Sequence, residues 1–331
     1  MTTTAPAASL ATGQGRPTVA YVLSRANPPQ LGPTLERHFA VHGLPDTDAI
    51  AASVAGFAAD VRALVTTTVA GADARLIAAL PKLELIVCLG GHVDRIDRQA
   101  AAARHIPVTN TPNVSAPDVA DLAIALMLAI SRRVCESDRF VRSGRWATQS
   151  MPFGRRVNGK RLGIVGLGTI GSIVARRAAG FDMEIAYHGR APKPGVPYRF
   201  YGDVAAMAAD VDYLTLHCQS GPETRHLVEA RVLKALGPEG FLINAARGQV
   251  VDEPALIRAL RDRSIAGAAL DVFENEPNVS PAFMDLDNVV VQAHHAAYTV
   301  ETKQIMTDLA LANLQAHFAG QPLVTPVADG H

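Results

Sequence analysis

A glycine-rich turn between an apolar segment and a helix most constrains the fold of this 331-residue chain. Gly166, Gly168 and Gly171 form the pattern G-x-G-x-x-G within RLGIVGLGTIG. The first glycine permits a tight turn, the second lets the backbone approach a pyrophosphate, and the third brings helix close to strand. The flanks fit this role, because residues 162–165 are typical of a buried strand and residues 170–179 of a helix. The pattern predicts a dinucleotide site at the amino end of that helix.

The next predicted strand, residues 183–187, ends in a cationic segment. An NAD-type site places an acidic residue here, roughly 20 residues past the glycines, to accept the ribose 2′-hydroxyls. This chain instead has Gly189, Arg190 and Lys193. Gly189 opens space, and the two cations suit a 2′-phosphate. We therefore expect NADP(H) as the preferred cofactor and NAD(H) as the second option; in the alternative interpretation Arg190 is a solvated surface charge.

Composition excludes several classes of protein. Lys+Arg and Asp+Glu both number 31, so we expect no nucleic-acid or anionic-membrane surface. The longest apolar stretch, residues 122–130, is too short to span a bilayer. The three cysteines lack metal-ligand and CxxC spacing, which indicates no metal site and a reduced, cytoplasmic protein. Residues 1–16 are interpreted as a disordered leader.

Short apolar runs alternate with helical patterns in two successive series. In the first, strands are predicted near residues 18–23, 63–67, 83–89 and 108–110, followed by a long apolar helix over residues 117–131. In the second, strands are predicted at residues 162–165, 183–187, 213–217, 241–245, 266–272 and 289–292. Because parallel strands need crossover helices, the pattern predicts an α/β fold with two doubly wound parallel-sheet (Rossmann-like) domains. The last helical stretch, residues 300–318, is expected to pack on the first domain, and a cleft between the domains is the expected ligand site.

Three polar side chains follow predicted strands of the second series. Arg247, Glu276 and His294 lie at or just beyond strand ends, where open α/β sheets bind ligands. An arginine there can pair with a carboxylate and polarise an adjacent carbonyl, which suits a 2-oxo acid. Histidine is the natural proton donor near neutral pH, and a carboxylate bonded to it favours the imidazolium. Each residue alone fits an ordinary structural role, but together they predict a proton relay beside a carboxylate clamp.

Over roughly residues 63–322 the chain resembles the D-isomer-specific 2-hydroxyacid dehydrogenases. The matching segments are VRSGRW (141–146), GLGTIG (166–171), PETRHLV (222–228), INAARGQVVDE (243–253), AGAALDVFENEP (266–277) and the region of His294. In that family the residues matching Arg247, Glu276 and His294 are catalytic, and the residue matching Asp271 orients the nicotinamide carboxamide. The segment FDMEIAYHGRAPKP is most similar to NADPH-using glyoxylate, hydroxypyruvate and hydroxyphenylpyruvate reductases.

The resemblance implies an oxidoreductase that reduces a small 2-oxo acid to the D-2-hydroxy acid with hydride from NADPH. It also implies an inserted NADP-binding domain, residues 112–298, and a substrate-binding (flavodoxin-like) domain built from residues 17–111 and 299–331. A homodimer is expected, in which residues near Trp146 often reach the partner's active site. The alternative is a non-catalytic dinucleotide-sensing protein like the corepressors that resemble this family.

The expected ligand contacts extend beyond the glycine turn. Those with the cofactor are Gly166, Leu167, Gly168, Thr169, Ile170, Gly171, Gly189, Arg190, Lys193, His217, Cys218, Thr224, Ala245, Ala246, Asp271, His294 and Ala296. Those with the substrate are Leu89, Gly90, Gly91, His92 and Arg247, with backbone N–H groups of residues 90–92 holding the carboxylate.

The chain departs from the family pattern beside the catalytic histidine and in the substrate loop. Family members usually have proline and isoleucine around that histidine, where this chain has Ala293 and His295. Without the proline, the placement of His294 is expected to be less constrained, and His295 is a competing candidate for its role. His92 stands where glycine is common. It is strained if its φ is positive, and its imidazole is alternatively a selector for a polar or bulky oxo acid.

Overall fold

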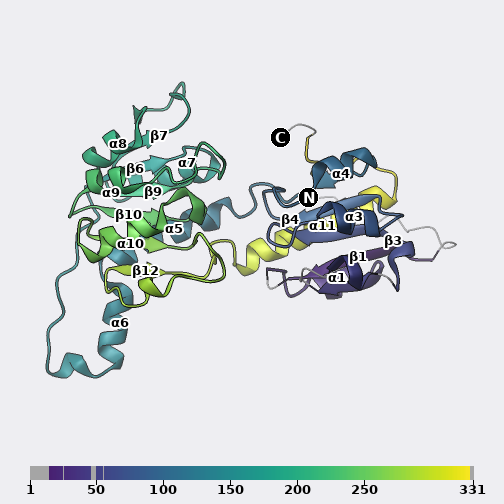
Figure 1. The fold of residues 1–331 in the computed structure, drawn as a ribbon, viewed down its shortest axis with the longest axis horizontal. Coiled ribbons are helices and arrows are strands. Elements are labelled where there is room, and N and C mark those ends of the chain that lie inside the picture. Colours follow the sequence, from purple (N-terminus) through teal and green to yellow (C-terminus); the bar gives the residue numbers. More distant parts are fainter. Residues whose placement is uncertain (1–14, 25, 46–49, 55, 329–331) are drawn as a thin grey trace, which may run out of the picture. The chain divides into compact units, whose positions relative to one another are not determined.

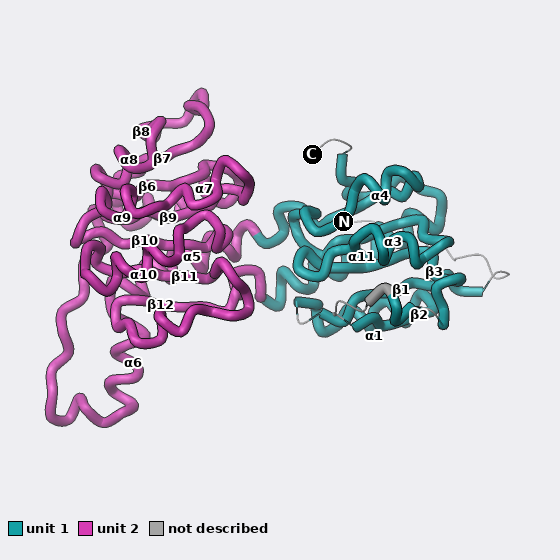
Figure 2. Tube along the Cα trace, in the orientation of Figure 1, with its two compact units in different colours: residues 1–115, 299–331 teal, residues 116–298 magenta. Residues whose placement is uncertain are grey.

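The computed structural model describes residues 15–24, 26–45, 50–54 and 56–328, with the side chains of residues 50 and 51 left out. Most of the predicted leader lies outside the described residues. The chain divides into two compact units (Figure 2), Met1–Ser115 with Thr299–His331 as unit 1 and Ala116–Tyr298 as unit 2. The chain thus passes from unit 1 into unit 2 between residues 115 and 116. The sequence analysis predicted this domain boundary between residues 111 and 112.

Unit 1 is a five-stranded parallel sheet with helices on both faces (Figure 1). Its strand order is β2-β1-β3-β4-β5, with β1 Thr18–Leu23, β2 Ala40–Pro45, β3 Val61–Thr67, β4 Leu85–Leu89 and β5 Val108–Thr109. Its helices are α1 Leu31–Glu36, α2 Ile50–Ser53, α3 Ala74–Ala79, α4 Arg98–Ala103 and α11 Val300–Phe318. Met306, Ala310 and Leu314 of α11 share a buried cluster with side chains of β1, β3 and β4. The predicted return of the last helix to the first sheet is therefore confirmed.

Unit 2 is a seven-stranded parallel sheet of order β12-β11-β10-β9-β6-β7-β8. Its strands are β6 Arg161–Val165, β7 Glu184–His188, β8 Arg199–Tyr201, β9 Tyr213–Leu216, β10 Phe241–Asn244, β11 Gly267–Leu270 and β12 Val289–Val291. Its helices are α5 Ala116–Ser131, α6 Val134–Arg142, α7 Thr169–Ala179, α8 Val204–Asp210, α9 Ala230–Leu236 and α10 Glu253–Arg261. Side chains of α5 and α7 build one buried cluster with the sheet, and those of α8, α9 and α10 build another.

These two sheets confirm the predicted α/β class. Two strands were not predicted, β2 and β8, and both lie at an edge of their sheet. β2 has one buried residue among six, and β8 has three residues in all, so neither shows the continuous apolar run of a central parallel strand. In the described part of the chain, no helix combines the length and the apolar character that crossing a bilayer requires.

The register of unit 2 brings the carboxyl ends of its strands into line. Val165 of β6 pairs with His188 of β7 and Leu216 of β9. Leu216 pairs in turn with Asn244 of β10, which pairs with Leu270 of β11. The residues that follow these strands therefore share one edge of the sheet, where open α/β sheets bind ligands.

Candidate active site

The glycine turn between β6 and α7 is tight at its first and third glycines and open at its second. Gly166 has φ +93°, and a Cβ there would lie 2.7 Å from the Cys218 nitrogen. A Cβ on Gly171 would lie 2.2 Å from the Gly166 carbonyl oxygen. At Gly168, by contrast, a Cβ would meet no described atom within 4 Å. Gly168 is also the N-cap of α7 and gives it no side-chain cap, so the first N–H groups of the helix are available to an anion.

Lys193 folds back onto this turn from the segment after β7. Its Nζ donates to the Leu167 carbonyl oxygen at 2.5 Å, and its backbone N–H donates to the Tyr187 hydroxyl at 2.7 Å. Gly189 and Arg190 directly follow β7, and Arg190 is exposed. The structure thus brings one of the two predicted cations to the glycine turn and leaves the other at the surface near the end of β7.

The side chains after β9 and β10 supply further polar and apolar atoms at the same edge. His217 Nε2 lies 2.9 Å from Thr215 Oγ1, while its buried Nδ1 has no hydrogen-bond partner among the described residues. Burial lowers the pKa of His217 to about 3, so its ring is neutral. Thr224 Oγ1 donates to the Gln219 carbonyl oxygen at 2.7 Å, and Ala245 and Ala246 are buried. An open glycine, an uncapped helix terminus and an unpartnered imidazole nitrogen fit a dinucleotide at this edge.

His294 and Glu276 form a short imidazole–carboxylate pair. His294 Nδ1 lies 2.6 Å from Glu276 Oε2, and the two side chains are 42% and 33% exposed. The other oxygen of Glu276, Oε1, accepts from the Phe273 N–H at 2.9 Å. Because an ionised carboxylate accepts and does not donate, the pair places a proton on Nδ1 and leaves Nε2 as the atom that can exchange a proton with a substrate.

Glu276 is ionised at neutral pH in this arrangement. Burial alone would raise the pKa of its carboxyl, but several neighbours together hold that pKa below its usual value. They are the hydrogen bond and charge of His294, the Phe273 N–H and the charge of Arg247. Arg247 follows β10, and its Nη1 donates to the Ala246 carbonyl oxygen at 2.8 Å. The three predicted catalytic residues thus act on one another at the edge of unit 2.

Asp271 fixes the segment that carries the histidine. This buried residue accepts from the His295 N–H at 2.7 Å and the Ala296 N–H at 3.1 Å, and its carbonyl oxygen accepts from the His294 N–H at 2.8 Å. Burial raises the pKa of its carboxyl. His294 is thus held at its backbone and its ring, and the looser placement expected from Ala293 stays a prediction. Asp271 therefore fixes the backbone around His294, a structural role that the family resemblance did not imply.

His295 does not compete for Glu276. Its ring stacks on Tyr298, with centroids 4.6 Å apart and planes 24° apart. Glu276 is paired with His294 alone of these two neighbouring histidines in the described structure. The geometry therefore favours His294, as the sequence did.

Four of the five predicted substrate residues belong to unit 1, where Leu89 ends β4 and Gly90, Gly91 and His92 follow it, whereas Arg247 belongs to unit 2. Gly90 has φ +136°, and a Cβ there would lie 2.3 Å from Thr68 Cγ2. Its N–H donates to Thr111 Oγ1 at 2.8 Å, and the His92 carbonyl oxygen accepts from Cys88 Sγ at 3.4 Å. His92 is not among the residues with positive φ, so the backbone strain considered for it does not arise.

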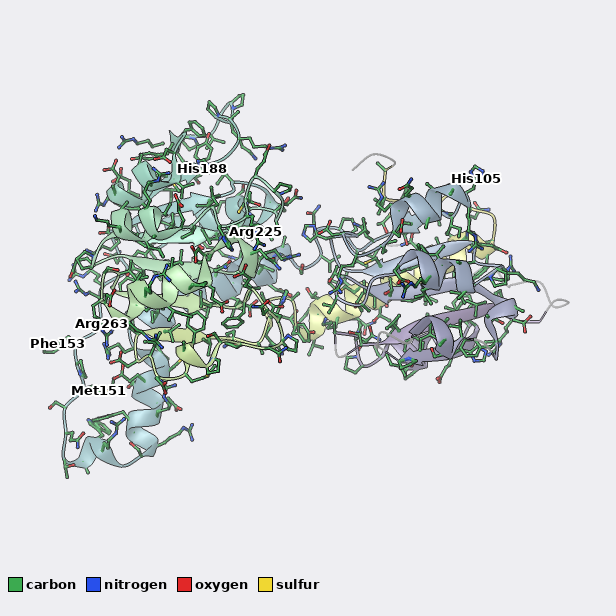
Figure 3. All side chains as sticks on the ribbon, viewed as in Figure 1. His105, Met151, Phe153, His188, Arg225 and Arg263 are labelled. Carbon is green, nitrogen blue, oxygen red and sulfur yellow. The ribbon has the colours of Figure 1, made fainter. Side chains whose placement is uncertain are left out.

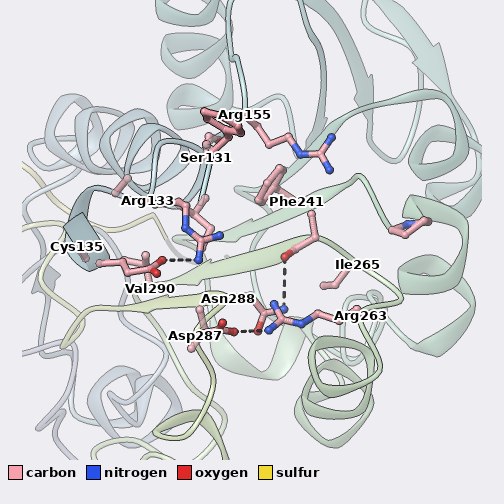
Figure 4. A pocket seen from close by; sticks show the side chains of 18 of the residues that line it. Ser131, Arg133, Cys135, Arg155, Phe241, Arg263, Ile265, Asp287, Asn288 and Val290 are labelled. Atoms are coloured by element: carbon pink, nitrogen blue, oxygen red, sulfur yellow. Dashed lines mark hydrogen bonds and ion pairs between the residues drawn. The ribbon is translucent and has the colours of Figure 1, made fainter. Parts of the chain in front are cut away.

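Within unit 2, a pocket of about 270 Å³ lies at the amino ends of β10, β11 and β12 (Figure 4), the edge of the sheet opposite to the predicted catalytic residues. Phe241, Ala266 and Val289, at or beside the starts of those strands, belong to its lining. Two of its arginines are paired, Arg133 with Glu136 at 2.6 Å and Arg263 with Asp287 at 2.5 Å. This pocket had no signal in the sequence, and it contains none of the predicted catalytic residues.

Comparisons with known proteins identify the family of this chain. Residues 124–296 match the family model of the D-isomer specific 2-hydroxyacid dehydrogenase NAD binding domain. Hydroxyphenylpyruvate reductase of Plectranthus scutellarioides is 47% identical over 82% of this chain and 86% of its own. A 2-hydroxyacid dehydrogenase from Ketogulonicigenium vulgare is similar in structure, with a TM-score of 0.89, 46% identity and coverage of 96% of this chain and 100% of that one. An NADPH-dependent glyoxylate/hydroxypyruvate reductase from Sinorhizobium meliloti, solved with NADP and malonate, gives a TM-score of 0.86, 38% identity and coverage of 95% and 97%. The chain belongs to the D-isomer-specific 2-hydroxyacid dehydrogenase family.

Proposed function

We propose that this protein reduces a small 2-oxo acid, such as glyoxylate, hydroxypyruvate or an aryl pyruvate, to the D-2-hydroxy acid with NADPH. The observation that carries the proposal is the 2.6 Å pair of His294 with an ionised Glu276. Arg247 and the glycine turn lie at the same edge of the unit 2 sheet. The names of the relatives support the substrate class. A non-catalytic sensor needs no such proton relay, so the corepressor-like alternative is not favoured.

The roles of the side chains follow from their chemistry. The bound nicotinamide supplies a hydride to the carbonyl carbon. Arg247 binds the substrate carboxylate and polarises the ketone. Of the predicted loop contacts, the backbone N–H groups of Gly91 and His92, next to Leu89, contribute to holding the carboxylate, because the Gly90 N–H donates to Thr111 Oγ1. His294 donates its Nε2 proton to the forming alkoxide, while the Glu276 carboxylate stabilises the imidazolium and orients its ring. The neutral imidazole then regains a proton from solvent.

The proposed cofactor site uses the carboxyl edge of unit 2. The N–H groups at the start of α7 and the open Gly168 would hold the pyrophosphate, and Arg190 and Lys193 would hold the 2′-phosphate. The predicted contacts beyond the glycine turn lie after neighbouring strands of the same sheet, and besides Arg190 and Lys193 they are Gly189, His217, Cys218, Thr224, Ala245, Ala246, Asp271, His294 and Ala296.

A panel of oxo acids assayed with NADPH and NADH in parallel tests the proposed reaction. We expect oxidation of NADPH with at least one of glyoxylate, hydroxypyruvate and phenylpyruvate, and a D-configured hydroxy acid as product. Failure of all three to be reduced with either cofactor, by a folded protein that binds NADPH, would instead support the sensor.

The preference for NADPH is expected to depend on Arg190. Arg190→Ala should raise the KM for NADPH about 10-fold and leave the KM for NADH nearly unchanged, because a hydrogen bond to a charged group contributes about 1.5–3 kcal/mol. Steady-state kinetics with both cofactors measure this. Arg176→Ala is the matched control, since Arg176 is an exposed arginine in the last turn of α7. Equal changes for both cofactors would show that Arg190 does not read the 2′-phosphate.

We also propose that the protein is a homodimer. α6 and the segment after it extend away from the sheet of unit 2 (Figure 1). Trp146 is 69% exposed and Phe153 is 100% exposed, and Figure 3 shows Phe153 beside Met151 on this segment. Such a run of exposed apolar groups is typical of a protein interface.

Sedimentation equilibrium should give about twice the chain mass of 35.0 kDa. We expect the double substitution Trp146→Ser with Phe153→Ser to weaken the dimer, because it removes apolar surface from the interface. Met284→Ser, which changes a residue 60% exposed elsewhere on unit 2, is the control. A monomeric wild-type protein at micromolar concentration would contradict the proposal.

A cytoplasmic location is proposed as well. Cys88, Cys135 and Cys218 are free thiols. Burial raises the pKa of Cys88 to about 12 and that of Cys218 to about 11, so both stay protonated at neutral pH. Free, unreactive cysteines are usual in a reducing compartment.

A further inference from the structure

The loop that carries Glu276 also carries a second carboxylate, and a second histidine holds it. His226 Nε2 lies 2.9 Å from Glu274 Oε1, and Arg225 Nη2 lies 3.2 Å from the same oxygen. The Glu274 side chain is 18% exposed, less than that of Glu276. The proposed reaction uses neither residue, so this pair calls for a reason of its own.

The two histidines share an uncommon backbone conformation. His226 and His294 both have φ +52°, in the left-handed region that residues with a Cβ rarely adopt. Such positions persist where surrounding contacts impose them, and they cluster at functional sites. The His226 N–H donates to the Gln249 carbonyl oxygen at 2.8 Å, which ties this residue to the segment after Arg247. His226 and His294 thus each reach one carboxylate of the same loop.

The segment after Arg247 lies directly against that loop. A Cβ on Gly248 would lie 2.0 Å from the carbonyl carbon of Phe273 and 2.4 Å from the Glu274 nitrogen. The Glu274 N–H donates to Glu253 Oε2 at 3.0 Å. Residues 273 and 274 are therefore fixed through their backbone as well as through the Glu274 carboxylate.

These contacts form a continuous path to the proton donor. Phe273 precedes Glu274, whose carboxylate His226 and Arg225 hold in place. The Phe273 N–H donates to Glu276 Oε1. Glu276 Oε2 then meets His294 Nδ1. A shift of residues 273 and 274 would withdraw the N–H that orients the Glu276 carboxylate, and misplacement by about 1 Å can lower a rate about 100-fold.

We propose that His226 and Glu274 are positioning residues that hold the Glu276 carboxylate against the His294 ring. An ordinary structural ion pair would change stability alone, whereas this role also changes the His294 hydrogen bond. The kinetic part of the inference rests on the proposed reaction, but the hydrogen bond can be observed without it.

The kinetic test compares Glu274→Ala, His226→Asn and the double substitution. Asparagine tolerates the left-handed conformation, so His226→Asn removes the imidazole with little backbone strain. Each single change should lower kcat about 10-fold with little effect on the KM for NADPH, and the double substitution should add little to either, because both break one path. Glu274→Gln keeps an acceptor oxygen, so it should retain most of the wild-type kcat. Glu239→Ala, which breaks an exposed pair with Arg155, is the control.

The second readout is the Nδ1 proton resonance of His294 in the cofactor-free protein, assigned by its loss in His294→Gln. A short bond to a carboxylate moves such a resonance downfield. We expect it to move upfield, or to vanish by exchange, in Glu274→Ala and His226→Asn, and to stay in Glu274→Gln and Glu239→Ala. Folded variants that keep both the resonance and the wild-type kcat would overturn the inference. A wild-type protein without turnover would instead refute the proposed reaction. The resonance would still show whether His226 and Glu274 position the Glu276 carboxylate.

Discussion

His294→Gln should lower kcat/KM for oxo-acid reduction about 1,000-fold, because it removes the group that donates the proton to the forming alkoxide, and general acid catalysis contributes about 10²–10⁴-fold. Binding of NADPH, followed by its fluorescence, should change little. Glutamine keeps an amide near Glu276 and cannot supply an acidic proton. His295→Gln is the matched control, since that ring stacks on Tyr298 and does not contact Glu276.

The pH profile should distinguish loss of an acid from loss of structure. The pKa of Glu276 is lowered, so its carboxylate is charged at neutral pH and accepts the Nδ1 proton of His294. Reduction needs a second ring proton, on Nε2, so wild-type kcat/KM should fall across the range of about pH 5 to 8 in which imidazole side chains ordinarily lose that proton. In His294→Gln the residual rate should be nearly independent of pH over this range. A flat wild-type profile would exclude His294 as the proton donor.

The sequence predicted most of the fold because central parallel strands are buried on both faces. Their near-continuous apolar runs, such as residues 162–165, stand out from the helical segments between them. The edge strands β2 and β8 were missed because exposure lets them carry polar side chains, as His42 and Arg199 show. The ends of helix α11 could be predicted because Thr299 caps its first turn and a glycine, Gly320, follows its last.

The candidate site was predictable in its residues and not in its contacts. Arg247, Glu276 and His294 follow strands, so topology alone brings them to one edge. The sequence does not say which acidic residue meets which histidine: Glu274 and Glu276 are two residues apart, and each pairs with a histidine from a different segment. Nor could it show that Asp271 secures the backbone after His294, because that depends on the course of the turn after β12.

Gly171→Ala should destabilise unit 2 by about 3 kcal/mol, at the upper end of the cost of inserting a methyl group into a well-packed site. The new Cβ would lie 2.2 Å from the Gly166 carbonyl oxygen, and this neighbour is backbone that cannot rotate away. Urea unfolding followed by circular dichroism measures the loss. An unfolding midpoint like that of the wild type would mean that the helix does not pack this closely on the turn.

Gly168→Ala should change stability far less than Gly171→Ala does and still weaken NADPH binding about 10-fold or more. The alanine Cβ would meet no described atom within 4 Å, and the φ of Gly168, −82°, suits any residue. Its methyl group would instead occupy the space through which the backbone approaches the pyrophosphate. Gly202→Ala, another open glycine, controls for the substitution itself. Unchanged NADPH binding by Gly168→Ala would mean that the pyrophosphate does not lie at this turn. Weaker binding with near-wild-type stability would show that Gly168 makes room for the cofactor, whereas Gly166 and Gly171 allow the turn itself to form.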